Sequence, residues 1–118
     1  MKYTYSILFL LILVACATQK PVLYHYPAGM KHSKRAAFVA DCEKGKVLYG
    51  IHCARCHNTM VDGKEVLPNF TPIQLEGYDL RMDEPKHKPT LTERNMPQEE
   101  LDLIIKYLWY KKPNKTIQ

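Results

Sequence analysis

The sequence predicts a small all-α domain, and three observations lead to that class. The chain has 118 residues, which is the size of a single domain. Apolar residues near the C-terminus recur at the spacing of one helix face. Turn-forming residues fill the middle of the chain, and no alternating run of apolar and polar residues predicts a strand. We expect this domain to occupy residues 41–118.

The N-terminal stretch is predicted to be a secretory signal, residues 1–15, rather than part of the domain. Lys2 precedes a continuous apolar run over residues 7–14. The run is too short for a membrane-spanning helix, which needs about 20 apolar residues. It leads into Leu13-Val14-Ala15-Cys16, which resembles the bacterial lipobox. This resemblance implies cleavage before Cys16 and acylation of its sulfur, and an ordinary signal peptide is the alternative.

Residues 16–40 are predicted to be a tether between the lipid and the domain, because they show no sustained periodicity. The aromatic cluster of Tyr24, His25 and Tyr26 could instead pack on the domain surface. Loss of residues 1–15 removes one lysine and no acid, so the formal net charge falls from +5 to about +4. That charge is not typical of a nucleic-acid-binding protein.

The first helix is predicted over residues 41–54. Asp41 is a suitable N-cap residue. Val47, Leu48 and Ile51 form a mostly apolar face beside Tyr49. The cysteine pair, Cys53 and Cys56, would then lie at the C-terminal end of this helix.

The middle of the chain is predicted to be mostly turns and loops. Residues 58–76 contain Asp62-Gly63 and Pro68-Asn69, which are turn signals, and a short helix could form over residues 71–76. Residues 83–92 combine prolines with charged residues and are typical of a loop.

The last helix has the strongest pattern. Pro97 suits its first turn, and two glutamates follow at the positive end of the helix dipole. Apolar residues then recur at i, i+3, i+4 and i+7, and Pro113 closes the segment. These apolar residues are Leu101, Ile104, Ile105 and Leu108.

The motif Cys53-Ala54-Arg55-Cys56-His57 admits three interpretations. A zinc site needs about four ligands, and no second cysteine pair follows to complete one. A redox disulfide of the thioredoxin type needs surrounding strands, whereas this pair follows a helix. The spacing C-x-x-C-H is the attachment signal for c-type haem. In that interpretation Cys53 and Cys56 form thioethers with one covalent haem c, and His57 binds its iron.

The chain also resembles the class I cytochromes c over residues 41–112. Residues 45–57, GKVLYGIHCARCH, look like the first helix of that family running into its haem motif, and residues 104–111, IIKYLWYK, look like its last helix. The resemblance implies an all-α, cytochrome c-like domain wrapped around one haem. It places Gly45, Tyr49 and Tyr107 where the first and last helices cross.

The same resemblance assigns a supporting role to Pro68. Residues 67–70, LPNF, look like the loop whose proline carbonyl accepts a hydrogen bond from the iron-binding histidine. Leu67 stands where the family usually has glycine, so the local match departs from the family pattern there.

The second iron ligand has several candidates. Met96 is the first, because class I cytochromes usually use a methionine that is often followed by proline, as Met96 is by Pro97. His87, in a loop between prolines, is the main alternative. Met82 is a third candidate, and an open site is the fourth.

These features predict an electron-transfer protein rather than an enzyme. We expect a membrane-anchored, monohaem electron carrier that meets redox proteins in the bacterial cell envelope and faces the periplasm or the exterior. A haem-containing subunit of a larger redox enzyme, a ligand-binding haem sensor and a lipoprotein without haem are the alternatives. The remaining cysteine, Cys42, is either a small buried apolar residue or one half of an intermolecular disulfide.

Overall fold

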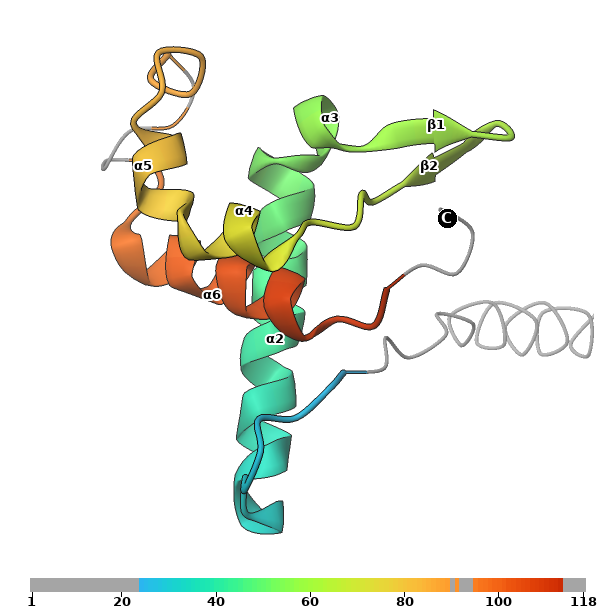
Figure 1. Ribbon diagram of the computed structural model, residues 1–118, viewed down its shortest axis with the longest axis vertical. Coiled ribbons are helices and arrows are strands. Elements are labelled where there is room, and N and C mark those ends of the chain that lie inside the picture. The colour runs from blue at the N-terminus through green and yellow to red at the C-terminus, as the bar shows by residue number, and fades with distance from the viewer. Residues whose placement is uncertain (1–23, 90, 92–94, 114–118) are drawn as a thin grey trace, which may run out of the picture.

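The computed structural model describes residues 24–89, 91 and 95–113 (Figure 1). The predicted signal segment, residues 1–15, and the predicted lipidation site, Cys16, lie outside these residues. The elements are η1 (His32–Lys34), α2 (Arg35–His52), α3 (Ala54–His57), β1 (Thr59–Val61), β2 (Lys64–Val66), α4 (Pro72–Glu76), α5 (Tyr78–Met82) and α6 (Gln98–Tyr110). No helix in this described part is long and apolar enough to cross a membrane.

The predicted class of an all-α, cytochrome c-like domain is wrong, because β1 and β2 form an antiparallel hairpin. Thr59 pairs with Val66, and Val61 pairs with Lys64. Asp62 and Gly63 connect the strands with φ angles of 50° and 72°. A two-residue turn with both φ angles positive has the twist that antiparallel strands need, and Asp-Gly is a preferred sequence for it. The hairpin projects away from the helices (Figure 1).

Helices α2 and α6 cross to form the centre of the fold (Figure 1). Gly45 lies at the crossing, where a Cβ atom would overlap the Leu103 carbonyl and lie 3.0 Å from the Tyr107 Cβ. Glycine therefore permits a closer backbone approach than any other residue. The ring of Tyr49 fills the space beside it, with its centroid 6.2 Å from that of Tyr107.

The first helix begins at Arg35 rather than at the predicted residue 41. Asp41 therefore lies inside α2, where its carboxylate pairs with Lys106 Nζ of α6 at 2.7 Å instead of capping a helix. The ring of Phe38 on the added turn packs edge-on against Tyr110, with centroids 5.0 Å apart. The local sequence did not predict this start, because the added turn contacts Tyr110, which is distant in sequence, through Phe38.

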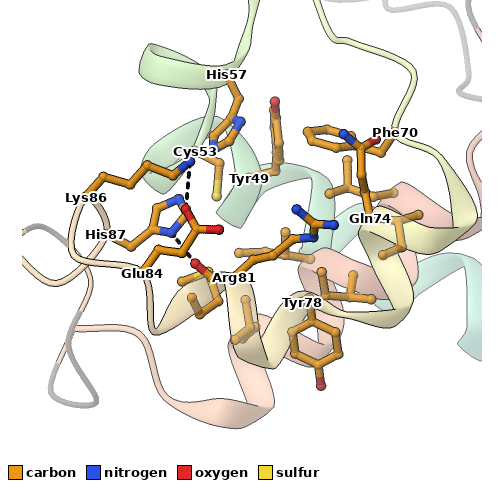
Figure 2. A pocket seen from close by; sticks show the side chains of 16 residues that line it. Tyr49, Cys53, His57, Phe70, Gln74, Tyr78, Arg81, Glu84, Lys86 and His87 are labelled. Carbon is orange, nitrogen blue, oxygen red and sulfur yellow. Dashed lines mark hydrogen bonds and ion pairs between the residues drawn. The ribbon is translucent and has the colours of Figure 1, made fainter.

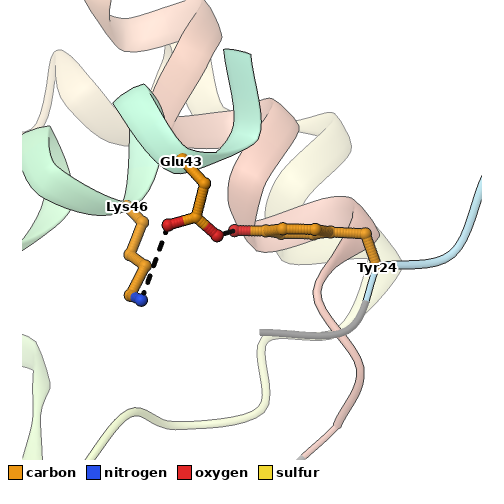
Figure 3. A network of polar contacts seen from close by, with 3 residues as sticks. All are labelled: Tyr24, Glu43 and Lys46. Carbon is orange, nitrogen blue, oxygen red and sulfur yellow. Dashed lines mark hydrogen bonds and ion pairs between the residues drawn. The ribbon is translucent and has the colours of Figure 1, made fainter. Parts of the chain in front are cut away.

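Part of the predicted tether also packs against the domain. Tyr24 is buried, forms a β-bridge with Lys111 and lies with its ring 6.4 Å from that of Tyr107. Its hydroxyl donates to Glu43 Oε1 at 2.7 Å, and Glu43 also pairs with Lys46 at 3.6 Å (Figure 3). The chain from Tyr24 onward is thus attached to both long helices.

Helices α4 and α5 are short and contact α6, whereas η1 and α3 contact α2. Thr71 caps α4: its Oγ1 accepts from the Gln74 amide at 3.3 Å, and Gln74 Oε1 accepts from the Thr71 amide at 2.8 Å. This capping box stabilises a helix of little more than one turn. The predicted last helix is present as α6, with Pro97 at its N-cap; Leu101, Ile104 and Leu108 of the predicted apolar face are buried, and Ile105 is partly buried.

Candidate cofactor site

An open cavity of about 230 Å³ lies between the C-terminal end of α2 and the short helices α4 and α5 (Figure 2). Apolar side chains of α4 and α6 form part of its wall: Leu75, Leu101, Ile104, Ile105 and Leu108. Polar side chains surround the rest, among them Gln74, Tyr78, Arg81, Glu84 and Lys86. The cavity is therefore apolar on the α6 side and charged at its rim.

Two residues of the C-x-x-C-H motif line this cavity. Cys53 ends α2 by donating its amide to the Tyr49 carbonyl at 2.8 Å, and the chain continues into the single turn of α3. Cys53 and His57 are four residues apart, so this turn brings both onto one face. Figure 2 shows the two side chains close together on the same side of the cavity. Cys56 is exposed and is not a cavity-lining residue.

The thiols differ in their surroundings. Cys53 is half-buried, and burial, followed by the effect of Cys56, raises its pKa to about 11. Its thiol is therefore protonated at neutral pH, unlike the low-pKa thiolate of a reactive redox cysteine. Cys42 is fully buried away from the cavity, as the first interpretation of this residue expects. Burial also raises the pKa of Cys42 to about 11.

The rings of His57 and His87 lie near one another. Their centroids are 6.0 Å apart and their planes differ by 22°. The ring of Phe70 covers another side of His57, with centroids 5.9 Å apart. Burial, then the nearby His87 and Lys86, lowers the pKa of His57. Its imidazole is therefore neutral near pH 7 and retains the lone pair that a metal ligand needs.

The two candidate methionines occupy different places. Met96 is buried, with 6% of its surface exposed, and lines a second cavity bounded by Leu91 and Lys88. It does not line the cavity that contains Cys53 and His57. Met82 borders both cavities. The structure thus brings His87 and Met82, but not Met96, to the site of the C-x-x-C-H motif.

The segment around Pro68 reaches the cavity through Phe70 rather than through Pro68. Pro68 itself is half-buried, and Phe70 is the member of the LPNF segment that lines the cavity. Gly45 and Tyr107 lie at the crossing of α2 and α6, and Tyr49 reaches from there to the cavity wall. The hydroxyl of Tyr49 donates to Asn58 Oδ1 at 2.8 Å, which joins α2 to the chain just after the motif.

Among the polar residues of the site that were not predicted are Gln74, Tyr78 and Arg81. They come from α4 and α5 and line one side of the cavity (Figure 2). Tyr78 is held by α6, because its hydroxyl donates to Asp102 at 2.8 Å. Gln74 lies on α4, whereas Tyr78 and Arg81 lie on α5 beyond Gly77, so no single helical pattern groups the three positions.

Within the part of the chain that the structure describes, no group of three or more His, Cys, Asp or Glu side chains could hold a metal ion by itself. Comparison of the chain with known protein families, characterised proteins and solved structures gave no match.

Proposed function

We propose that this chain is a membrane-anchored c-type cytochrome that carries one electron at a time in the bacterial cell envelope. The proposal rests on one observation above all. Cys53 and His57, from a motif with the spacing of a haem attachment signal, line the same apolar-walled cavity. It also rests on the export signal predicted for residues 1–15, which agrees with attachment of haem outside the cytoplasm.

Several residues around the cavity suit a haem, and Cys56, exposed on α3, would have to turn toward the cavity to form the second thioether. The apolar side chains of α4 and α6 suit the hydrocarbon part of a porphyrin, and Arg81 supplies a positive charge for its carboxylates. A porphyrin brings four nitrogens to its iron, so two protein ligands complete the coordination. A cluster of three protein ligands is consequently not needed.

Each group of the chain has a defined task in this proposal. Cys53 and Cys56 hold the cofactor through two thioethers, and the turn of α3 sets their spacing. His57 would bind the iron as a neutral imidazole, with its exposed ring against Phe70 on one side. When bound, the haem supplies an iron that alternates between the ferrous and ferric states. Because Cys56 is exposed, the thioether side of the site is open to a redox partner.

The proposed membrane anchor is an acyl group on the sulfur of Cys16. Acylation of this residue would confine the protein to a membrane surface and raise the effective concentration of redox partners on that surface. Arg55, which is exposed between the two cysteines, adds a positive charge where such a partner would dock. We therefore expect partners with an acidic docking surface.

A redox titration followed by visible absorption tests the proposal. We expect sharp c-type bands in the reduced protein and a reversible one-electron curve. The full chain should be produced in cells that contain the c-type haem attachment machinery. A colourless product would contradict the proposal. A reduced protein that readily binds carbon monoxide under native conditions would favour a haem sensor over an electron carrier.

A further inference from the structure

We infer that His87, and not Met96, is the second protein ligand of the iron. This inference rests on the proposed function and deepens it, because the second ligand determines the potential and the reactivity of the site. Four features support it: the separation of the His57 and His87 rings, the tautomer of His87, the anchoring of its loop, and the position of Met96.

The first feature is the separation of the two imidazole rings. A metal–imidazole nitrogen bond is about 2 Å long, so two imidazoles on one metal have centroids about 6 Å apart once half of each ring is added. The centroids of His57 and His87 lie 6.0 Å apart, and the planes are within 22° of parallel. The separation is that of two imidazoles sharing one iron, and because the rings are stacked, each would have to turn to point its Nε2 at that iron.

The second feature is the hydrogen bond of His87. Its Nδ1 lies 2.6 Å from the carbonyl oxygen of Arg81. A carbonyl oxygen can only accept, so Nδ1 must carry a proton, and Nε2 is the ring nitrogen left to bind a metal. A metal-binding histidine commonly donates its other ring nitrogen to a backbone carbonyl in this way, which fixes the ring and raises its basicity.

The third feature is the loop that carries His87. The His87 amide donates to the Glu84 carbonyl at 2.9 Å, and the His87 carbonyl accepts from the Leu91 amide at 2.8 Å. Lys86 pairs with Glu84 at 2.8 Å in the same turn. These contacts order the loop, and the contact between His87 Nδ1 and the Arg81 carbonyl, drawn in Figure 2, joins it to α5.

The fourth feature is the position of Met96. Its neighbour Pro97 is the N-cap of α6, and the Pro97 carbonyl accepts from the amides of Glu100 and Leu101 at 3.0 and 3.1 Å. Met96 lines the second cavity, which Leu101 and Met82 also border. To reach the iron ligated by His57, the Met96 sulfur would have to leave its buried site and pass these two side chains.

Two imidazoles give a lower reduction potential than an imidazole and a thioether, because the thioether favours the ferrous state. With His57 and His87 both bound to the iron, small ligands such as carbon monoxide would have to compete with His87. We therefore expect His87→Met to raise the potential relative to the unmodified protein.

Optical and electron paramagnetic resonance spectra of the oxidised full chain test this inference. We expect a low-spin iron with two nitrogen ligands and no far-red absorption from a sulfur–iron bond. His87→Ala should abolish the low-spin signal and allow carbon monoxide to bind after reduction. Met96→Leu should leave the spectra unchanged, and so should His32→Ala, a control that removes an exposed histidine outside the cavity.

A far-red sulfur–iron band in the unmodified protein would overturn the inference, and its loss in Met96→Leu or Met82→Leu would identify the methionine responsible. A high-spin unmodified protein that binds carbon monoxide would overturn it in favour of an open site. The spectrum of the unmodified chain decides between these results even if His87→Ala does not fold. A chain without haem would defeat the proposed function as well, whereas a haem protein unaffected by His87→Ala would defeat this inference alone.

Discussion

The α2–α6 crossing and the cavity beside it use the same two helices in different ways. At the crossing, Gly45 brings the backbones together, and Cys42 and Ile104 are almost completely buried with 0% and 2% of their surface exposed. At the cavity, elements of five residues or fewer from α3, α4 and α5 surround an open space, and many of their side chains are exposed. The crossing is dense, and the cavity wall is not.

We expect the crossing to determine the stability of the fold and the cavity to determine the proposed binding of the cofactor. A packed crossing of two long helices gains its free energy from burial of side chains that contact one another. The cavity wall gains less from such contacts, since each short helix is held by a cap or a few hydrogen bonds. Changes at the crossing should therefore alter the free energy of unfolding, whereas changes at the cavity should alter cofactor binding.

The largest effect is expected at Gly45. Gly45→Ala should lower the free energy of unfolding by about 3 kcal/mol, because the added methyl group would overlap the Leu103 carbonyl and force the helices apart. Gly50→Ala in the same helix is the matched control, since a Cβ atom there meets nothing within 4 Å. It should raise the free energy by about 0.5–1 kcal/mol through its better helix propensity. Urea unfolding followed by circular dichroism measures both. Equal effects of the two substitutions would show that the crossing is not tightly packed.

The next effect concerns alkaline pH. Burial is the largest cause of the raised pKa values of Tyr24, Tyr49 and Tyr107, which surround the crossing. The unfolded chain would lose these protons near pH 10 while the folded chain retains them, so stability should fall as pH rises above about 10. Tyr49→Phe should make this fall shallower by up to about 1.4 kcal/mol per pH unit. Unfolding curves recorded from about pH 8 to about pH 11 measure the slope. An unchanged slope in Tyr49→Phe would contradict the burial of its hydroxyl.

The smallest effect is expected for the ion pair between Asp41 and Lys106, which joins α2 to α6 at their surface. Their side chains are 46% and 35% exposed, so solvent screens the pair. Asp41→Asn should change the free energy of unfolding by about 0.5 kcal/mol, and salt at about 1 M should remove the difference. A larger loss that persists in salt would show that polar contacts, in addition to packing, hold the crossing together.

The sequence predicted the elements that depend on local patterns. Helix α6 was found because its apolar residues follow helical spacing over its whole length. The hairpin was missed, although Asp62-Gly63 is a strong signal for one, because the flanking strands have only three residues each. The start of α2 was missed because it depends on a contact between Phe38 and Tyr110, which no local pattern encodes.

The candidate site was predicted unevenly for the same reason. Cys53, Cys56 and His57 lie within one short motif, so their spacing alone indicates attachment of a c-type haem. The proposed second ligand lies in another segment, and Met96-Pro97 fits a sequence pattern although Met96 lines a different cavity from Cys53 and His57. Choosing among Met96, His87 and Met82 required distances between segments, which the sequence does not contain.

The most direct test of the proposed haem attachment is the intact mass of the denatured chain. The unmodified protein should carry the added mass of one haem, because thioether bonds survive denaturation. The double variant Cys53→Ala/Cys56→Ala should lack that mass, whereas Cys42→Ala, which alters the buried cysteine away from the cavity, should retain it. An unmodified chain that lacks the added mass, after production alongside the c-type haem attachment machinery, would contradict the proposal.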